Sequence, residues 1–308
     1  MLCLCAYYYS SSFLVALVFQ RIPSLNGDVY EGQLLDGQPH GRGKMKYAIK
    51  SNTAGTKDCI STNCTSYGGD WVNGVRCGEG KLAWSDGTVY RGEYNDDKMS
   101  GQGKLTLSNR DIYQGSFVND ERTGHGKYTR RDGRVHEGDF VDGKMHGRGK
   151  ITYTSGSVYD GEWKNDSKHG CGKITYIDGG VYEGDWRYDR KDGRGKRIWS
   201  DGIAYEGDWM DGGMHGRGKY TWPCGMVYEG DFKCDASHGH GKLTYPSGAW
   251  YEGDWEDDVR SGRGKSVYSN GDLYEGEFKN DKRNGHGIMT YADGMVEDGQ
   301  WKNGKFKA

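Results

Sequence analysis

Pairs of carboxylates recur along the chain beside aromatic residues, as Glu229 and Asp231 do in the segment YEGDF. Two neighbouring carboxyl groups could act as a general acid and a general base. Each pair is followed, however, by a basic segment such as HGHGK at residues 238–242. Ion pairs between neighbouring segments account for the carboxylates, so the sequence predicts no catalytic residue and indicates that the chain is not an enzyme.

Five of the nine histidines occupy one recurring position, which raises the question of a metal site. Neighbouring copies are 23 residues apart. Two strands apart they would be separated by about 10 Å, too far to share a zinc ion with bonds of about 2.1 Å. A histidine that closes a turn by bonding the backbone is the favoured interpretation; a metal shared between two chains is the alternative, and no metal is predicted. The residues are His40, His146, His169, His215 and His238.

Nucleotide sites are also disfavoured. Gly264-Lys265-Ser266 resembles the end of a phosphate-binding loop, but that motif requires a glycine where this chain has Val259. The many GxG triplets do not lead from a strand into a helix, as a dinucleotide site requires. Basic residues alternate with carboxylates instead of forming a stripe, which argues against nucleic acid as a partner. No cofactor is predicted.

The aromatic and basic segments are two halves of one repeat of 23 residues. The first half has the form YEGDW, as at residues 182–186, and the second the form HGRGK, as at residues 215–219. They alternate from about residue 27 to residue 308, so the chain is an array and not a set of unlike domains. The tyrosine position of successive repeats is filled by Tyr30, Tyr67, Tyr90, Tyr113, His136, Tyr159, Tyr182, Tyr205, Tyr228, Tyr251, Tyr274 and Glu297.

Each half of the repeat predicts one strand of a β-hairpin. In an extended strand Tyr159, Gly161 and Trp163 share one face, and the carboxylates between them lie on the other. Turn residues such as Asp178-Gly179 separate the halves, and glycines would cost about 1 kcal/mol each inside a helix. The pattern predicts an antiparallel meander in which rings cover glycines on one face and opposite charges pair on the other.

The combined pattern, YEGxW followed by HGxG and a DG turn, resembles the MORN repeat (membrane occupation and recognition nexus), in about eleven copies plus a fragment. The resemblance implies an all-β, elongated, single-layer antiparallel sheet of hairpins over residues 27–308. It also implies a non-enzymatic protein-interaction scaffold of a cytoskeletal, ciliary, flagellar or cortical structure in the cytoplasm. An adaptor at membranes that binds phosphoinositides is the alternative. The departures are Leu34 at the tryptophan position, Gly68 at the glutamate position, and His136 and Glu297 at the tyrosine position.

The aromatic face of the central repeats is the predicted partner-binding surface, because no second layer is expected to cover it. Cytoskeletal or axonemal proteins are the predicted partners. Acidic lipids rank behind them, because the one tight basic cluster is Lys302, Lys305 and Lys307. The predicted binding residues are Tyr159, Trp163, Tyr182, Trp186, Tyr205, Trp209, Tyr228, Phe232, Tyr251 and Trp255.

A homodimer through the C-terminal repeats is also predicted. Gln300-Trp301-Lys302 is not followed by a GxGK segment, so Trp301 is expected to lack a glycine strip beneath it. A second copy could supply that strip across a two-fold interface. The competing interpretation is that the surrounding charges keep this edge from pairing.

Two segments depart from the repeat. Residues 1–26 form an apolar leader, expected outside the array, with no charge before Arg21; a disordered leader, a membrane anchor and a secretion signal are the alternatives, in that order. A 14-residue polar insertion lies within about residues 48–66. The eight cysteines occupy no fixed position of the repeat, which favours reduced thiols in the cytoplasm over a disulfide scaffold.

Overall fold

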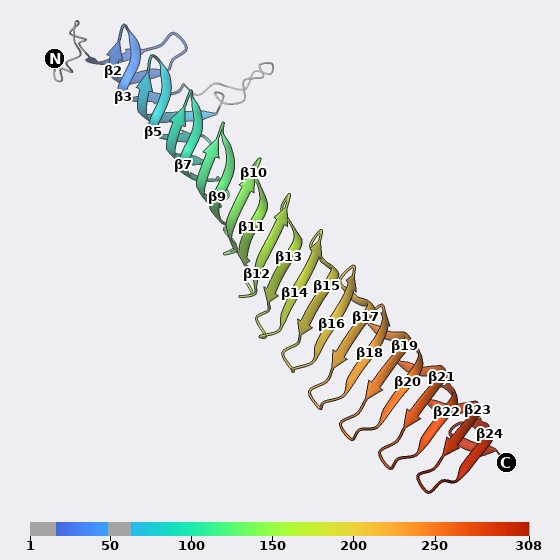
Figure 1. The fold of residues 1–308 in the computed structure, drawn as a ribbon. Helices are drawn as coiled ribbons and strands as arrows, with labels where there is room; N and C mark the ends of the chain where they lie inside the picture. Colours follow the sequence, from blue (N-terminus) through green and yellow to red (C-terminus); the bar gives the residue numbers. More distant parts are fainter. Residues whose placement is uncertain (1–16, 49–62, 308) are drawn as a thin grey trace, which may run out of the picture. The chain divides into compact units, whose positions relative to one another are not determined.

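The computed structural model describes residues 17–48 and 63–307, which belong to two compact units: an N-terminal unit (residues 1–154) and a C-terminal unit (residues 155–308). Every regular element in the described ranges is a β-strand, and within each unit the strands follow one another in chain order (Figure 1). No helix in these ranges is long and apolar enough to cross a membrane. The predicted all-β meander of antiparallel hairpins is confirmed.

The strand bounds follow the repeat. In the N-terminal unit the strands are β1 (Val18–Pro23), β2 (Val29–Leu35), β3 (Gln38–Lys46), β4 (Cys64–Val72), β5 (Val75–Trp84), β6 (Val89–Asn95), β7 (Lys98–Thr106), β8 (Ile112–Val118), β9 (Glu121–Thr129), β10 (Val135–Val141) and β11 (Lys144–Thr152). In the C-terminal unit they are β12 (Val158–Lys164), β13 (Ser167–Thr175), β14 (Val181–Arg187), β15 (Arg190–Ile198), β16 (Ala204–Met210), β17 (Gly213–Thr221), β18 (Val227–Lys233), β19 (Ala236–Thr244), β20 (Trp250–Glu256), β21 (Val259–Val267), β22 (Leu273–Lys279), β23 (Lys282–Thr290), β24 (Val296–Lys302) and β25 (Lys305–Lys307).

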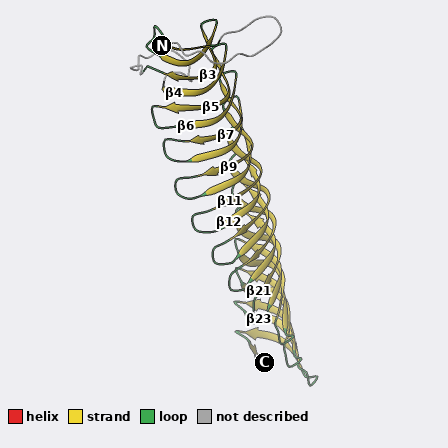
Figure 2. Cartoon of the chain, turned by 90° about the vertical axis from the view of Figure 1, so that its left-hand side faces the viewer, coloured by secondary structure: helices red, strands yellow, loops and turns green. Residues whose placement is uncertain are grey.

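Each repeat folds as a hairpin, and in most of them the second strand is two residues longer than the first, as in β12 and β13. In the hairpin of β12 and β13, Tyr159 lies opposite Ile174 and Gly161 lies opposite Gly172. The register then shifts at a bulge before Trp163, and such a bulge bends the strand and increases its twist. The same shift recurs between β14 and β15 and between β20 and β21. Figure 2 shows the resulting bent strands, joined by short loops.

The turns explain the Asn, Asp and Gly residues between the strands. Asn165 and Asp166 both have positive φ, at 49° and 69°, as the tight type I′ hairpin turn requires. The second turn residue also bonds to the preceding hairpin. Asp189, in the turn between β14 and β15, accepts a hydrogen bond through its carboxylate at 3.0 Å from the backbone N–H of Lys168 in β13.

The core of each unit lies on the face where tyrosine rings cover glycines. A methyl group added to Gly172 would overlap the ring of Tyr159. The Tyr159 hydroxyl donates a hydrogen bond to the carbonyl of Glu162 at 2.9 Å, so this fully buried side chain keeps its polar group satisfied. The predicted arrangement, with rings sheltering bare backbone, is therefore present.

Rings of successive repeats meet edge to face. The Tyr182 ring centroid lies 5.2 Å from that of Trp186 in its own repeat and 5.1 Å from that of Trp209 in the next, with interplanar angles of 89° and 83°. Such pairs contribute roughly 0.5–1.5 kcal/mol each beyond the area they bury. The Trp209 indole N–H also donates to the carbonyl of Gly195 at 3.0 Å. The aromatic row thus joins each hairpin to the next.

The two segments that depart from the repeat fall partly within the described residues. Residues 18–23, which the sequence placed in the leader outside the array, form β1 and pair with β2, so this part belongs to the sheet of the N-terminal unit. Residues 1–16, and with them the alternatives for the leader, lie outside the described residues. Most of the polar insertion, residues 49–62, also lies outside them, and its end from Cys64 onward belongs to β4.

The ring-over-glycine contact predicts a sharp difference between two glycines of the N-terminal unit. Gly103→Ala should destabilise the protein by about 1–3 kcal/mol, because its methyl group would overlap the Tyr90 ring. Gly68→Ala is the matched control, since its nearest neighbour would be Lys44 Cγ at 4.0 Å. This second substitution should be neutral or slightly stabilising. Urea unfolding of both variants checks this; equal losses of stability would contradict the role given to the ring.

Candidate partner-binding surface

The ten aromatic residues predicted to bind partners form one row in the C-terminal unit, here called the inner row. The inner-row tyrosines are 0–1% exposed, and its tryptophans and phenylalanine are 4–7% exposed. No second layer covers these side chains, yet they are buried and form the core of the unit, so they do not present an exposed aromatic patch. Their contribution to partner binding stays a prediction.

Long basic side chains help to bury the inner row. Lys191 Nζ lies 4.3 Å from the ring centroid of Trp209 and 5.2 Å from that of Tyr182. Burial, and to a smaller extent the positive charge of Arg197, lower the pKa of Lys191 to about 8. Arg260 covers Tyr251 in the same way, with 5.4 Å between its guanidinium carbon and the ring centroid. A single layer is thus covered by side chains of its own strands, whose charged groups lie over the rings.

A second set of aromatic residues, here called the outer row, follows the second strand of each hairpin. These side chains are half-buried. Trp222 packs on Tyr220 with centroids 4.5 Å apart, and Tyr220 in turn lies 5.9 Å from Trp199. Sequence reasoning missed this row as a candidate site, although its 23-residue period was visible beside each turn. The outer row of the C-terminal unit consists of Tyr176, Trp199, Trp222, Tyr245, Tyr268 and Tyr291.

The outer and inner rows meet at a hollow with a volume of about 500 Å³. Trp222, Met226 and Tyr245 line it from the loops, and inner-row residues line it from β18 and β20. The lining carboxylates Asp235 and Asp258 are engaged, because they accept hydrogen bonds from the backbone of the preceding hairpins at 2.7 Å. The hollow therefore offers aromatic and thioether surface to a partner.

Trp301 does not lie uncovered at the C-terminal edge, as the sequence suggested. It is 3% exposed, and its indole N–H donates to the carbonyl of Gly287 at 3.0 Å. The short strand β25 pairs with β24 and brings Phe306 to 5.2 Å from the Trp301 ring. Arg283 covers the ring as well, at 4.2 Å. The premise that Trp301 needs a second copy to cover it is therefore wrong.

The opposite face of the C-terminal unit carries the predicted rows of paired charges. Lys196 Nζ lies 3.2 Å from a carboxylate oxygen of Glu206, and Lys219 Nζ lies 2.7 Å from one of Glu229. These side chains are about half exposed, so each pair contributes roughly 0–1 kcal/mol. Their main effect is to neutralise this face.

Three of the recurring histidines contact side chains in the turn of the next hairpin. His40 Nδ1 lies 3.3 Å from Asn73 Oδ1, and His238 Nδ1 lies 3.5 Å from Asp257 Oδ1. The His169 ring packs on Tyr188 at 5.7 Å. In the described ranges no three histidine, cysteine or carboxylate side chains are placed to hold a metal ion.

Comparison with protein families agrees with the hairpin geometry. The MORN repeat model matches residues 30–51, 67–89, 90–112, 113–133, 136–158, 159–181, 182–203, 205–227, 228–250, 251–273, 274–296 and 298–307. The chain belongs to the MORN repeat family. The matches include the repeats in which His136 replaces the tyrosine and Leu34 replaces the tryptophan, and both residues are buried in the core. MORN repeats indicate a repeat-based interaction scaffold.

Solved structures resemble the MORN chain only weakly. The TCP10 domain of Danio rerio CPAP, in complex with a peptide of Danio rerio STIL, is 14% identical over 73% of this chain and 95% of that one, with a TM-score of 0.37. The TCP domain of SAS-4 from Drosophila melanogaster, in complex with a proline-rich motif of Ana2, is 13% identical over 56% of this chain and 87% of that one, with a TM-score of 0.33. Likenesses at this level carry no argument about function. No curated protein matches the sequence.

The buried tyrosines of the MORN repeats predict a loss of stability at alkaline pH. Burial raises the pKa of Tyr113 and of Tyr274 to about 12, above the ordinary value near 10. The folded state holds these protons more tightly than the unfolded state. The stabilisation is therefore complete below about pH 10 and is lost as the pH rises toward 12, by about 1.4 kcal/mol per pH unit for each titrating tyrosine.

Urea unfolding at a series of pH values, followed together with tyrosinate absorbance, measures this loss. Tyr113→Phe should make the decline shallower, because one titrating group is removed. Tyrosinate formation complete in the folded protein near pH 10 would contradict the prediction.

Proposed function

We propose that this MORN chain is a non-enzymatic scaffold that holds partner proteins on a cytoskeletal, ciliary, flagellar or cortical structure, and that a partner docks on the outer row of the C-terminal unit. The observation that carries the proposal is the hollow lined by Trp222, Met226 and Tyr245. Family membership supports the scaffold role. The cytoskeletal setting is the family-level expectation stated from the sequence.

The chemistry of the hollow suits a protein side chain. Tryptophan and tyrosine present large, rigid apolar surfaces and are enriched where binding energy concentrates. Met226 is half-buried, and methionine adapts its shape to different partners. The inner row beneath fixes the floor of the hollow, since Tyr228 is 1% and Trp255 is 7% exposed. A partner that inserts an apolar side chain would find a preformed site.

The membrane adaptor is the alternative, and the charged face of the C-terminal unit does not favour it. Attraction to an acidic membrane needs clustered unpaired basic residues. Here Lys173, Lys196 and Lys219 each pair with a glutamate on the neighbouring strand. Protein partners therefore rank ahead of acidic lipids.

Retention in cells tests the proposed docking site. A tagged full-length chain should remain in the detergent-insoluble cytoskeletal fraction. The double variant Trp222→Ala with Tyr245→Ala should be released from it, with retention falling about tenfold, because two anchors of the hollow are removed. Fractionation and microscopy of the same cells measure this.

The matched control is Arg217→Ala, an exposed residue on the opposite, charged face. It should be retained like the unchanged chain. Circular dichroism must show that the double variant remains folded. Equal retention of the double variant, or a location on membranes that detergent removes, would contradict the proposal.

Self-association through the C-terminal repeats stays a secondary proposal, now based on β24 and not on Trp301. Among the described residues, β25 pairs with only the last three residues of β24. The first part of that edge carries Val296, which is 59% exposed, and such an edge can pair with a second copy. Sedimentation equilibrium should give a dimer for the full chain and a monomer for a chain ending at Asp293. A dimer that survives the truncation would exclude this edge.

A further inference from the structure

In three successive repeats, the charged face of the N-terminal unit lacks the glutamate that neutralises the lysines of the C-terminal unit. The position held by Glu183, Glu206 and Glu229 in the C-terminal repeats is held by Gly68, Arg91 and Gln114 in three successive N-terminal repeats. The lysines of the neighbouring strands are kept, as Lys81 and Lys104 show. Three repeats therefore present basic side chains with no glutamate at the position that faces them.

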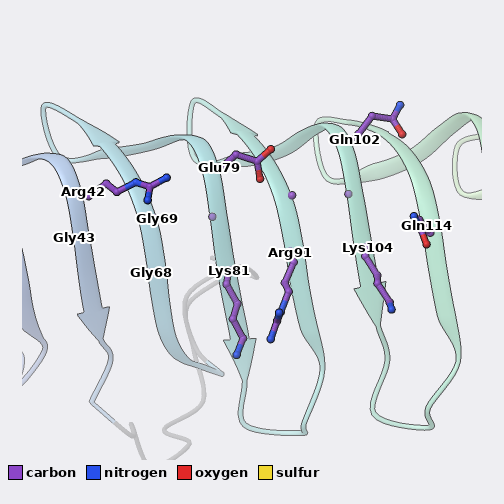
Figure 3. Close-up of a pocket in the computed structure, with 13 residues that line it drawn as sticks. Arg42, Gly43, Gly68, Gly69, Glu79, Lys81, Arg91, Gln102, Lys104 and Gln114 are labelled. Carbon is purple, nitrogen blue, oxygen red and sulfur yellow. The ribbon is translucent and has the colours of Figure 1, made fainter.

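The structure brings these basic residues together in one groove (Figure 3), with a volume of about 820 Å³, here called the basic groove. Lys81 on β5 lies directly opposite Arg91 on β6, and Arg91 lies opposite Lys104 on β7. In Figure 3 the three side chains extend toward the same side of the groove. With strands about 4.8 Å apart, three cations lie within about 10 Å.

These three cations have no ion-pair partner among the described residues. Like charges directly opposite each other destabilise a sheet, whereas the equivalent residue of the C-terminal unit, Glu206, lies between Lys196 and Lys219 and pairs with Lys196. The sheet thus carries an unfavourable charge arrangement at Arg91 that a bound anion would relieve.

Carboxylates on the same face limit the shape of that anion. Asp70, Glu79 and Glu93 form a neighbouring row, in which Glu79 lies opposite Glu93. Asp70 is paired with Arg42 at 3.1 Å, and Glu93 accepts a hydrogen bond from the backbone of Gln102 at 2.9 Å. A ligand must follow the basic row and avoid the acidic one, so it must be narrow.

We propose that the basic groove binds an acidic, extended segment of a partner protein, with its carboxylates against Lys81, Arg91 and Lys104. About four residues of an extended chain span this row, because such a chain advances about 3.3 Å per residue. Its side chains alternate between two faces, so acidic residues at every second position would face the cations. At the glutamate position of the repeat, the two ends of the row hold Gly68, which has no side chain, and Gln114, which is uncharged. Neither end therefore carries a carboxylate at this position. This site lies in the other unit, on the charged face, so it does not depend on the docking hollow proposed above.

Other anions fit this geometry less well. A planar acidic membrane would face the acidic row as well as the basic one, and the two would largely cancel. Single-stranded nucleic acid is usually held by aromatic side chains that stack on its bases. The core rings of the N-terminal unit lie buried on the other face, over the glycines.

Binding of fluorescein-labelled hexaglutamate to the full chain, followed by fluorescence anisotropy at low and at physiological ionic strength, tests the proposal. The unchanged protein should bind saturably, and more weakly at higher salt because exposed charges are screened. Arg91→Glu should weaken binding about tenfold or more. The same change should leave the protein as stable or more stable, because the new carboxylate lies between two lysines. A structural defect would instead lower stability and binding together.

Lys233→Glu is the charge-matched control, since Lys233 is an exposed residue of β18 in the C-terminal unit. It changes the net charge by the same amount and should leave the affinity within about twofold. Glu183→Gln, Glu206→Arg and Glu229→Gln, added together to Arg91→Glu, transfer the basic row to the C-terminal unit, because the three positions then carry no carboxylate beside Lys196 and Lys219. This transfer variant should restore peptide binding.

Four results would overturn the proposal. The first is the absence of saturable binding by the unchanged protein, and the second is equal weakening by Arg91→Glu and Lys233→Glu. The third is failure of the folded transfer variant to bind. The fourth is a protein that does not bind hexaglutamate but binds phosphatidylserine vesicles in phosphatidylcholine, or a single-stranded oligonucleotide, and loses that binding in Arg91→Glu. Because Trp222 and Tyr245 are unchanged in all these variants, failure here leaves the docking hollow untouched, and failure of the hollow leaves this test intact.

Discussion

The packing of one tyrosine ring over a pair of glycines is the contact on which each unit depends. A single layer of strands has no second sheet or helix against which to bury side chains, so it must build a core from its own surface. Glycine makes this possible because any Cβ at Gly172 or Gly161 would meet Tyr159 or the backbone of the paired strand. The ring then removes the backbone itself from water while its hydroxyl bonds the nearby carbonyl of Glu162.

Once the rings lie on glycine, the remaining contacts follow. A tyrosine flat on one hairpin presents its edge to the tryptophan of the next, as Tyr182 does to Trp209. The tryptophan N–H reaches a glycine carbonyl of the preceding hairpin. Each repeat is therefore stabilised mainly by its neighbours, as in other repeat proteins. Because the core occupies the ring face, the proposed recognition on that side involves the outer row beside the turns.

Much of the hairpin was predictable from the sequence because it depends on local patterns. Alternation placed Tyr159, Gly161 and Trp163 on one face, and the Asp-Gly and Asn-Asp pairs marked the turns. The side chains that complete the burial of the rings could not be predicted from local patterns, because they come from other strands. Lys191 lies over Trp209, and Phe306 lies beside Trp301 only because β25 turns back. The bulge that bends each hairpin likewise follows from packing and leaves little trace in the alternation.

The charged face follows a different constraint, and this explains why its composition differs between the units. Its side chains are exposed and its ion pairs contribute little to stability, so a substitution there leaves the core intact. Replacing a glutamate by Arg91 keeps the strand, the glycine pair beneath it and the ring of Tyr90 in place, as the buried Tyr90 shows. The repeat thus separates two tasks: the ring face must stay uniform for the sheet to form, while the opposite face can vary its charge from one repeat to the next. Specificity in such an array is therefore expected where a repeat departs from its own pattern on the exposed face, and the three successive departures at Gly68, Arg91 and Gln114 are of this kind.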